Sequence, residues 1–524
     1  MRENTGDSLP QSLLTDFLRG DPDRMPPVAD QSAFRAPESL YAPPGRMKQT
    51  PALTWRPGMF FLGVLDGEIK TDDKGRPYVM GGFAVGVDDD RHVCTFAGSR
   101  AGKGRSAILP NMLHYPGSVL ATDPKGELAT ITARRRAGMG QAVHVLDPFA
   151  VAGGAGAKYR AGFNPVEAMR LDHNLVADAA LIADALVVVA GKDPHWDDSA
   201  KALIEGVILH LKTWPDYEGK RSLLTLRELL GRGAEDEQAP SGYSLDALAA
   251  EMRANGAADG VIETAAADFF DRPPNERGSV LSTARRHLKF IDLFRNNPVG
   301  RKTLESHSFD LADLKRKATT IYLCLPARHI GTCNRWLRLF VNLTLQTMEQ
   351  VRGPLPGGVP VLIVLDEFAA LGHLQQVEDA AGQIAGFGVK LWPVLQDLAQ
   401  LKALYEARWE TFLGNAGIVQ FFGNNDLSTL EWISKRCGKT SIEAVRMGDV
   451  TVPQGMQGAK GLSRSTEVHD LLTIDEAARY FGRDDPMLRQ LVIWPGRRTP
   501  FLVLQRAYYD KHGLFAGLFD SPPQ

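Results

Sequence analysis

The sequence has few cysteines, no long apolar run and almost no net charge. Only four cysteines occur among 524 residues, and no two have the CxxC spacing of a zinc or redox site. A disulfide-stabilised secreted protein is therefore excluded, and a reducing cytoplasm is the expected location. The 60 Lys and Arg residues balance 62 Asp and Glu residues, which leaves a net charge of −2. This balance excludes a protein that coats nucleic acid through bulk charge, while local basic patches stay open.

No segment of the sequence predicts a membrane-spanning helix. A span needs about 20 mainly apolar residues. The run Leu175–Ala190 contains Asp178 and Asp184, and Val359–Leu365 is only as long as a strand. The N-terminus lacks the apolar core of a secretory signal. The 12 His and four Cys residues form no ligand array, so we expect no structural metal.

Strand and helix signals alternate along most of the chain, which predicts an α/β fold with a mainly parallel sheet. Apolar strand candidates are Phe60–Leu65, Gly82–Val87, His92–Ala97, Ser118–Thr122, Ala142–Leu146, Thr320–Leu325, Val361–Leu365, Val389–Leu395 and Ile418–Phe422. The strand signal vanishes between about 170 and 310, where apolar spacing predicts helices. The predicted organisation is a flexible arm (1–50), a first part of the α/β domain (51–170), an inserted all-helical domain (171–310), a second part of the α/β domain (311–510) and a loose tail (511–524).

A glycine-rich turn between a predicted strand and a predicted helix has the composition of a phosphate-binding loop. Small residues let successive backbone N–H groups surround phosphate oxygens, and a lysine at a helix N-terminus adds positive potential. The residues expected to contact phosphate are Gly98, Ser99, Arg100, Ala101, Gly102, Lys103, Gly104 and Arg105. Ala97 and Gly104 replace the glycine and the Ser/Thr of the general motif, and Ser99 or Ser106 is the candidate for the missing hydroxyl. A surface turn without a ligand is the alternative.

Two further predicted strands end in polar residues. Asp366 and Glu367 follow the apolar strand Val361–Leu365, and Gln396 follows the strand Val389–Leu395. Ligands of parallel sheets bind at the carboxyl ends of strands. An aspartate there is suited to Mg²⁺, and a following glutamate is suited to polarising water. A solvated strand end is the alternative interpretation of the acidic pair.

These motifs together resemble the TraG-type coupling ATPases of conjugation and type IV secretion. The resemblance covers roughly 55–510 in collinear order. It is carried by the runs Ala97–Gly104, Asp123–Glu127, His195–Ala200, Arg277–Ala284, Asn334–Arg338, Leu365–Gly372, Gln396–Leu401 and Leu471–Glu476. It implies a RecA-like P-loop ATPase, usually hexameric, with an all-helical domain inserted between its two nucleotide motifs.

The resemblance also implies roles for particular residues, with ATP and Mg²⁺ as cofactors. Lys103 would bind the β- and γ-phosphates, and Asp366 would organise Mg²⁺. Glu367 would activate water, and Gln396 would report the γ-phosphate. Some family members carry an arginine finger near the position of Gln383 in this sequence. The alternatives here are Arg328, Arg335 and Arg338.

The resemblance implies a motor that moves DNA or a nucleoprotein toward a secretion channel. The expected partners are single-stranded DNA bound without sequence preference, a relaxase or other secreted protein, and further copies of the chain. Most members begin with transmembrane helices, whereas this sequence predicts none. We therefore expect a cytoplasmic protein that is held at the inner membrane by a separate membrane or channel partner. The alternatives are a soluble FtsK/HerA-like DNA translocase and a recruitment platform that barely hydrolyses ATP. The basic clusters Arg134–Arg136, Arg285–Lys289 and Lys315–Lys317 are either DNA contacts or solvated helix faces.

Overall fold

The computed structural model describes residues 44–73, 75–188, 194–231, 244–447, 462–496, 501–507 and 513–522. The chain divides into two compact units. Unit 1 comprises Met1–Asn111, Leu395–Ala403 and Ala416–Ala516, and unit 2 comprises Met112–Val394, Leu404–Asn415 and Gly517–Gln524. Residues 1–43 of the expected arm lie outside the described residues. The end of that arm is helix α2 (Pro44–Gln49), which buries the side chain of Met47.

The sheet of unit 1 combines a parallel pair of strands with an antiparallel side. Its order is β4 (Phe83–Val87), β1 (Phe60–Leu65), β15 (Phe501–Gln505), β14 (Arg489–Ile493), β11 (Ala416–Phe422) and β5 (His92–Ala97). Among the described strands of this unit, β5 and β11 are parallel, and β11–β14, β14–β15, β15–β1 and β1–β4 are antiparallel pairs. Every residue of β5 is buried, which explains the run of apolar and β-branched residues that follows His92.

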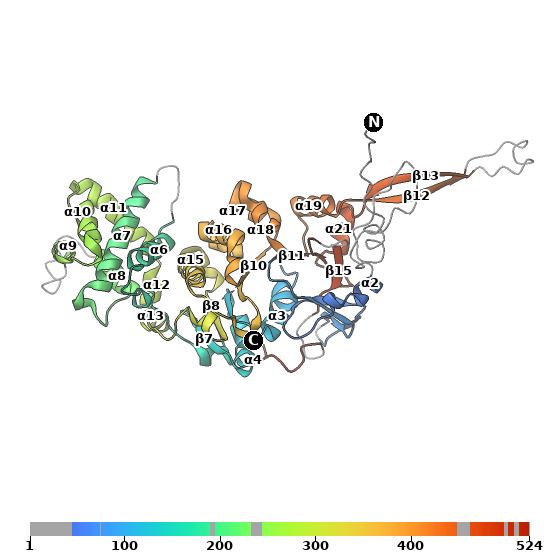
Figure 1. Cartoon of the computed structure of the whole chain (residues 1–524), viewed down its shortest axis with the longest axis horizontal. Helices are drawn as coiled ribbons and strands as arrows, with labels where there is room; N and C mark the ends of the chain where they lie inside the picture. The colour runs from blue at the N-terminus through green and yellow to red at the C-terminus, as the bar shows by residue number, and fades with distance from the viewer. Residues whose placement is uncertain are drawn as a thin grey trace, which may run out of the picture. The chain divides into compact units, whose positions relative to one another are not determined.

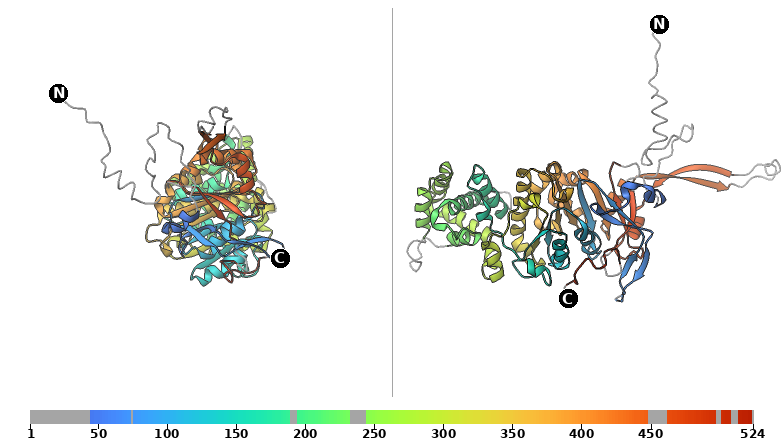
Figure 2. Two further views of the ribbon diagram at one scale, coloured as in Figure 1. Left: turned by 90° about the vertical axis from the view of Figure 1, so that its right-hand side faces the viewer. Right: turned by 60° about the horizontal axis from the view of Figure 1, so that its bottom comes forward.

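Two hairpins extend unit 1. The short hairpin β2 (Glu68–Thr71) and β3 (Pro77–Met80) lies between β1 and β4 in sequence. The longer hairpin β12 (Lys439–Met447) and β13 (Leu462–Asp470) is antiparallel over its whole length and projects from helices α19 (Leu427–Cys437) and α21 (Ile474–Tyr480) (Figures 1 and 2). The sequence analysis predicted β1, β4, β5 and β11 but not the strands β2 and β3, the hairpin β12–β13 or the pair β14 and β15.

The sheet of unit 2 is entirely parallel, which confirms the predicted α/β class. Its order is β10 (Val389–Leu395), β9 (Val361–Leu365), β6 (Val119–Asp123), β8 (Thr319–Cys324) and β7 (Ala142–Leu146). All five strands were predicted to within about one residue. The crossover connections include helices α4 (Glu127–Gly138), α15 (Ala327–Gln350) and α16 (Gln375–Gln383). Such crossovers cover both faces of a parallel sheet, and the strands are accordingly buried.

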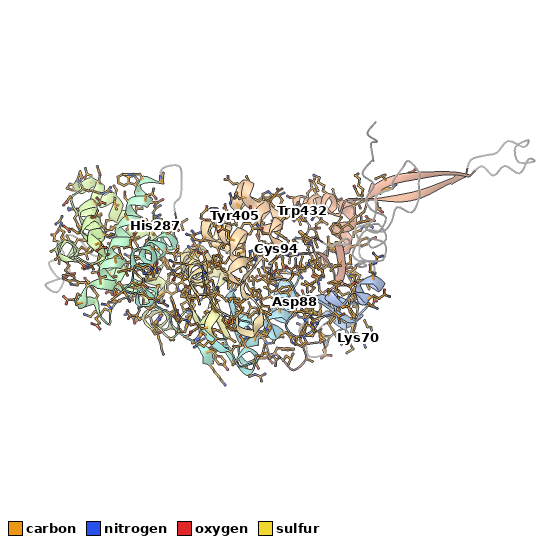
Figure 3. The ribbon with its side chains drawn as sticks, viewed as in Figure 1. Lys70, Asp88, Cys94, His287, Tyr405 and Trp432 are labelled. Atoms are coloured by element: carbon orange, nitrogen blue, oxygen red, sulfur yellow. The ribbon has the colours of Figure 1, made fainter. Side chains whose placement is uncertain are left out.

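The described residues between β7 and β8 form helices and no strand (green in Figure 1). The longer ones are α6 (Leu175–Leu186), α7 (His195–Thr213), α8 (Leu223–Gly231), α9 (Leu245–Ala254), α10 (Val261–Phe270), α11 (Pro274–Leu288) and α13 (Pro298–Glu305). Asp197 and Asp198 occupy the first turn of α7, where the helix dipole favours acidic side chains. Asp197 also accepts hydrogen bonds from Arg286 (2.7 Å) and from His287 (2.8 Å), which is labelled in Figure 3.

The described part of the C-terminal segment packs against the protein, contrary to the expected loose tail. Phe515 is fully buried, and its ring meets the ring of Phe61 edge-on at 5.2 Å between centroids. In unit 2, Asp520 accepts a hydrogen bond from Nε of Arg134 at 2.7 Å. The sequence analysis did not predict this packing, because the apolar residues of this short C-terminal segment show no helical or strand periodicity. No helix within the described ranges has both the length and the apolar character that a bilayer span requires.

Candidate nucleotide-binding site

The phosphate loop of unit 1 adopts an unusual backbone conformation. It begins where β5 ends, and the N–H of Ala101 donates to the carbonyl of Gly98 at 3.1 Å, which closes a turn. Arg100 has φ +58° and Gly102 has φ +89°, in a region that side-chain-bearing residues rarely adopt. Lys103 then returns to right-handed helical angles. Such alternation of handedness turns successive N–H groups toward a common anion site.

The loop requires glycine where it meets the end of β11. The N–H of Gly98 donates to the carbonyl of Phe422 at 3.1 Å. A Cβ at Gly98 would lie 1.8 Å from the carbonyl oxygen of Gly423, so no side chain fits there. A Cβ at Gly423 would lie 2.2 Å from Cβ of Ala101. The loop is therefore seated directly on the backbone at the end of β11.

The two hydroxyl candidates lie in different environments, Ser106 in the helix after the loop and Ser99 in the loop itself. Ser106 is buried, and its N–H (2.8 Å) and its Oγ (2.9 Å) both donate to the carbonyl of Gly102. Ser99 is exposed in the loop. Residues Gly104–Ile108 form a π-helical turn, a feature that recurs at functional sites. A Cβ at Gly104 would meet nothing within 4 Å, so packing does not demand glycine at that position.

Gln396 belongs to the same unit as the phosphate loop, and its backbone is held on both sides. Nδ2 of Asn424 donates to the carbonyl of Gln396 at 2.9 Å, and the N–H of Gln396 donates to Oε1 of Gln400 at 3.0 Å. Asn424 directly follows Gly423, on which the phosphate loop rests. The end of β11 thus organises both the loop and the Gln396 segment. The sequence analysis missed this role of Asn424, and its only signal was its position after a predicted strand.

The acidic pair of unit 2 lies at the carboxyl end of β9. The carbonyl of Asp366 accepts from Oγ1 of Thr122 at 2.9 Å, and Oδ1 of Asp366 accepts from the N–H of Glu367 at 3.0 Å. Glu367 has φ +54°. A non-glycine residue in this region costs of order 1–3 kcal/mol, and such residues cluster at functional sites. The strand end is therefore a constrained structure rather than an ordinary solvated turn.

A third carboxyl group, on Asp123, lies at the end of the neighbouring strand β6. Asp123 is 2% exposed, and its Oδ2 accepts from the N–H of Ala129 at 2.9 Å. Burial raises the pKa of Asp123 to about 7, against the lowering effect of the backbone hydrogen bonds, and the charges of Asp366 and Glu127 add to the rise. The sequence analysis included Asp123 only in a family motif and gave it no role.

The acidic strand ends fit a magnesium ion that is bound together with phosphates. Carboxylate oxygens are the donors that Mg²⁺ prefers, and the ion usually takes one or two of them and keeps water and phosphate ligands. Across the described residues, no group of three or more His, Cys, Asp and Glu side chains is arranged to hold a metal. A magnesium ion at this strand end would therefore need further ligands, such as nucleotide phosphates, beside the predicted ligand Asp366.

Two of the three arginine-finger candidates are held inside unit 2. Nη1 of Arg338 donates to the carbonyls of Leu371 (3.1 Å) and His373 (2.6 Å), just after the acidic pair. Nη2 of Arg335 lies 3.4 Å from Nδ1 of His287. These contacts use both guanidinium groups within the chain. Arg328 is exposed, although its Nε lies 3.2 Å from Nε2 of the adjacent His329, and Gln383 at the end of α16 is exposed too.

Several cations of the predicted basic clusters are structural. Arg136 is fully buried and donates to the carbonyls of Met112, Tyr115 and Gly117. Nζ of Lys315 donates to the carbonyls of Met348 and Val351 at the end of α15. Arg286 pairs with Asp197. In each cluster, at least one cation is therefore used for contacts within the protein rather than for contacts with DNA.

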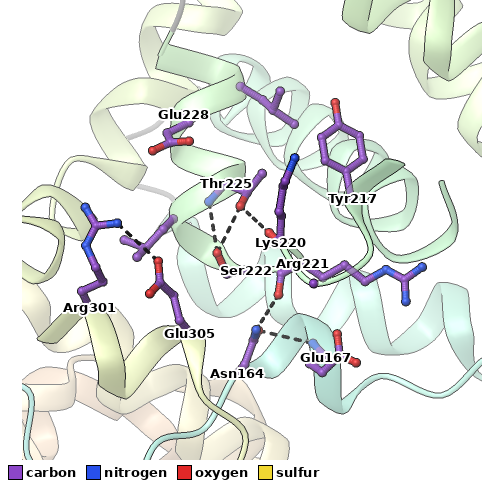
Figure 4. Close-up of a pocket in the computed structure, with 13 residues that line it drawn as sticks. Asn164, Glu167, Tyr217, Lys220, Arg221, Ser222, Thr225, Glu228, Arg301 and Glu305 are labelled. Atoms are coloured by element: carbon purple, nitrogen blue, oxygen red, sulfur yellow. Dashed lines mark hydrogen bonds and ion pairs between the residues drawn. The ribbon is translucent and has the colours of Figure 1, made fainter. Parts of the chain in front are cut away.

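A cavity of about 570 Å³ lies among the helices of unit 2 (Figure 4). Its charged lining residues are Glu167, Lys220, Arg221, Glu228, Arg301 and Glu305. Three cations face three carboxylates, and Arg301 pairs with Glu305 at 3.4 Å. Asn164 caps the short helix α5 (Pro165–Ala168) beside this cavity. No residue expected to bind nucleotide lines the cavity.

The chain has clear relatives among known proteins. A family model described as "Type IV secretory system Conjugative DNA transfer" matches residues 62–510. The chain is 29% identical over 416 residues to the Conjugal transfer protein TraG of Escherichia coli, which covers 75% of this chain and 62% of that protein. It spans 55–62% of the length of three curated relatives that it matches.

Solved structures of the plasmid coupling protein TrwB share the fold. The complex of TrwB with the ATP analogue ADPNP gives a TM-score of 0.60 at 15% identity and covers 94% of this chain and 99% of that one. The complex with ADP and Mg²⁺ gives 0.56 at 16% identity, with 80% and 86% covered. The family model, for its part, spans most of the sequence. The chain therefore belongs to the family of type IV secretory system proteins for conjugative DNA transfer.

Proposed function

We propose that the protein is an ATP-hydrolysing motor that couples DNA or a nucleoprotein to a type IV secretion channel. The observation that carries this proposal is the conformation of the phosphate loop. Arg100 and Gly102 both have positive φ between a buried strand and a helix N-terminus. This geometry suits polyphosphate binding. TrwB, which shares the fold, has been solved with ADPNP and with ADP and Mg²⁺.

Each site residue has a proposed role. The loop Gly98–Arg105 offers backbone N–H groups to the phosphates, and Lys103 supplies the positive charge for their β- and γ-oxygens. Asp366 holds Mg²⁺, which when bound neutralises charge developing on the phosphates. Glu367 accepts the proton of the attacking water. Gln396, fixed by its backbone contacts, is the proposed sensor of the γ-phosphate.

The proposed partners follow from the family. The motor acts as a homo-oligomer, proposed to be a hexamer, on single-stranded DNA gripped through its phosphates. A relaxase or other secreted protein docks on the helices between β7 and β8. A separate membrane or channel protein holds the motor at the cytoplasmic face of the inner membrane. Because Arg328 is exposed, whereas Arg335 is half-buried and Arg338 is buried, Arg328 is the proposed finger acting on a neighbouring subunit.

The test is ATP turnover by the purified protein with single-stranded DNA, with double-stranded DNA and without DNA, at low and moderate salt. A DNA motor is expected to be stimulated, and the stimulation should fade with salt because phosphate contacts release counterions. Lys103→Ala is the matched control for contaminating ATPases and should show no turnover.

The outcomes separate the candidate functions. Slow turnover that ignores DNA would contradict the motor and favour a recruitment platform. Stimulation by DNA in a protein that binds no relaxase and no secretion component would favour an FtsK/HerA-like translocase. Turnover by Lys103→Ala equal to that of the wild type would contradict the phosphate-loop assignment itself.

A further inference from the structure

A fully buried arginine from the C-terminal part of the chain contacts the phosphate loop. Arg506, which directly follows β15, is 1% exposed. Its Nη1 donates to the carbonyl of Ala101 at 2.6 Å, and its Nε donates to the carbonyl of Leu488 at 3.2 Å. The two residues of the Arg506–Ala101 bond are 405 positions apart in the sequence. All of these residues belong to unit 1.

The surroundings of Arg506 fix its guanidinium group. The backbone N–H of Arg506 donates to the carbonyl of Leu488 at 2.8 Å, the same carbonyl that accepts from Nε. The guanidinium carbon lies 5.2 Å from the centroid of the Phe422 ring. Phe422 also accepts the N–H of Gly98 through its carbonyl. Phe422 therefore contacts both the arginine, through its ring, and the first residue of the loop, through its carbonyl.

The hydrogen bond to Ala101 determines the direction of the next N–H group. The described residues contain no cis peptide bond, so the peptide between Ala101 and Gly102 is trans and planar. In such a peptide the N–H points opposite to the C=O. With the Ala101 carbonyl held by Arg506, the N–H of Gly102 points away from Arg506. The first hydrogen bond of the helix runs from the N–H of Ser106 to the carbonyl of Gly102. The N–H groups of residues 102–105 therefore stand at the helix N-terminus, before its regular hydrogen bonds begin.

This peptide would otherwise rotate easily. Gly102 has φ +89°, and glycine populates both signs of φ at little cost. A rotation of the Ala101–Gly102 peptide would replace a donor by a carbonyl oxygen at the loop. A carbonyl oxygen repels phosphate, whereas an N–H binds it.

We propose that Arg506 is a positioning residue that locks the Ala101–Gly102 peptide with its N–H directed at the nucleotide phosphates. The inference rests on the proposed nucleotide binding. Arg506 touches no nucleotide and acts through the loop. Its buried positive charge also lies on the carbonyl side of the loop and adds to the potential that attracts phosphate.

The test is the Kd for Mg-ADP of purified Arg506→Met, measured by titration calorimetry, together with the fraction of molecules that bind. Methionine keeps most of the buried volume but removes both donors. We expect the Kd to rise about tenfold to a hundredfold, the range for one lost hydrogen bond to a charged acceptor. The binding fraction of folded protein should stay that of the wild type. The KM for ATP should rise in the same proportion, while kcat at saturating ATP stays within about twofold.

The matched control is Arg136→Met, which removes another fully buried arginine that donates to three carbonyls outside the phosphate loop. It should lower the stability and leave the Kd unchanged. If Arg506→Met does not fold, the Kd of Arg506→Lys is the deciding measurement. Its single amine replaces the two donor nitrogens Nη1 and Nε, so the Kd for Mg-ADP should still rise.

The results that overturn the inference are defined in advance. A wild-type Kd in Arg506→Met, or in Arg506→Lys where only that variant folds, would overturn it. An equal rise of the Kd in Arg136→Met would overturn it too, since the effect would be general loosening. Failure of the wild-type protein to bind Mg-ADP would instead refute the proposed function.

Discussion

The Arg338 contact should stabilise both the protein and the segment that follows the acidic pair. Arg338 is 8% exposed, and its Nη1 donates to the carbonyls of Leu371 and His373. Arg338→Met removes both bonds while keeping a long, apolar side chain in the buried position. The variant also leaves the carbonyl of the buried Leu371 without this donor.

The size of the effect follows from the two bonds. A hydrogen bond to a charged donor contributes about 1.5–3 kcal/mol, and the exposed side of His373 lets water replace part of the second bond. We therefore expect the free energy of unfolding to fall by roughly 2–4 kcal/mol. The loss should be accompanied by lower kcat, because the segment directly continues from Glu367. The Kd for Mg-ADP should stay unchanged, because the phosphate loop is not touched.

The assay is urea denaturation followed by tryptophan fluorescence, with ATP turnover measured on the same samples. Gln346→Met is the matched control, since Gln346 lies on the same helix α15 and donates to Asp178 at 3.1 Å rather than to the segment after the acidic pair. It should cost less than about 1 kcal/mol and leave turnover unchanged. Wild-type stability and turnover in Arg338→Met would refute the reasoning, as would a cost no larger than that of the control.

Three further predictions concern the acidic strand ends and the loop. Glu367→Gln should bind ATP with wild-type affinity but hydrolyse it at least about a hundredfold more slowly, and wild-type turnover would contradict its role as base. Lys103→Ala should abolish binding of Mg-ATP in calorimetry, whereas retained tight binding would contradict the loop assignment. Asp123, with a pKa raised to about 7, binds its proton more tightly in the folded protein than in the unfolded chain. The free energy of unfolding should therefore fall as pH rises from about 4 through 7. In EDTA, the Asp123→Asn variant should not show this fall, and equal pH dependence of the wild type and the variant would refute the assignment to Asp123.

The local pattern of the sequence was enough for the parallel strands. Val361–Leu365 and Val389–Leu395 are observed with the predicted bounds, because mainly apolar runs ended by polar residues define strands buried on both faces, even where Lys390 interrupts the second run. The phosphate loop was predicted for a similar reason, since the chemistry of phosphate binding demands small residues and one lysine at fixed spacing. The family resemblance rested on these local motifs.

The antiparallel side of unit 1 was not predictable in this way. Strands β14 and β15 contain buried polar residues, and Gln490 is accommodated because its Nε2 donates to the carbonyl of Leu62 at 2.6 Å. Gln505 likewise exchanges hydrogen bonds with the backbone of Gly67. A polar residue interrupts the apolar pattern that marks a strand, while its partner is more than 400 positions away.

The sequence by itself determined which residue types stand at the ends of the strands and in the loop. Only the tertiary structure decided what holds them, because such contacts join segments that are distant in the chain. It showed that Arg506 lies against Ala101, that Arg338 holds the segment after Glu367, and that Asp123 is buried near Asp366. It also placed Arg136 in the interior, where the sequence showed only a basic cluster. A charged side chain is buried when backbone carbonyls satisfy its donors, and that condition is set by chain closure rather than by local pattern.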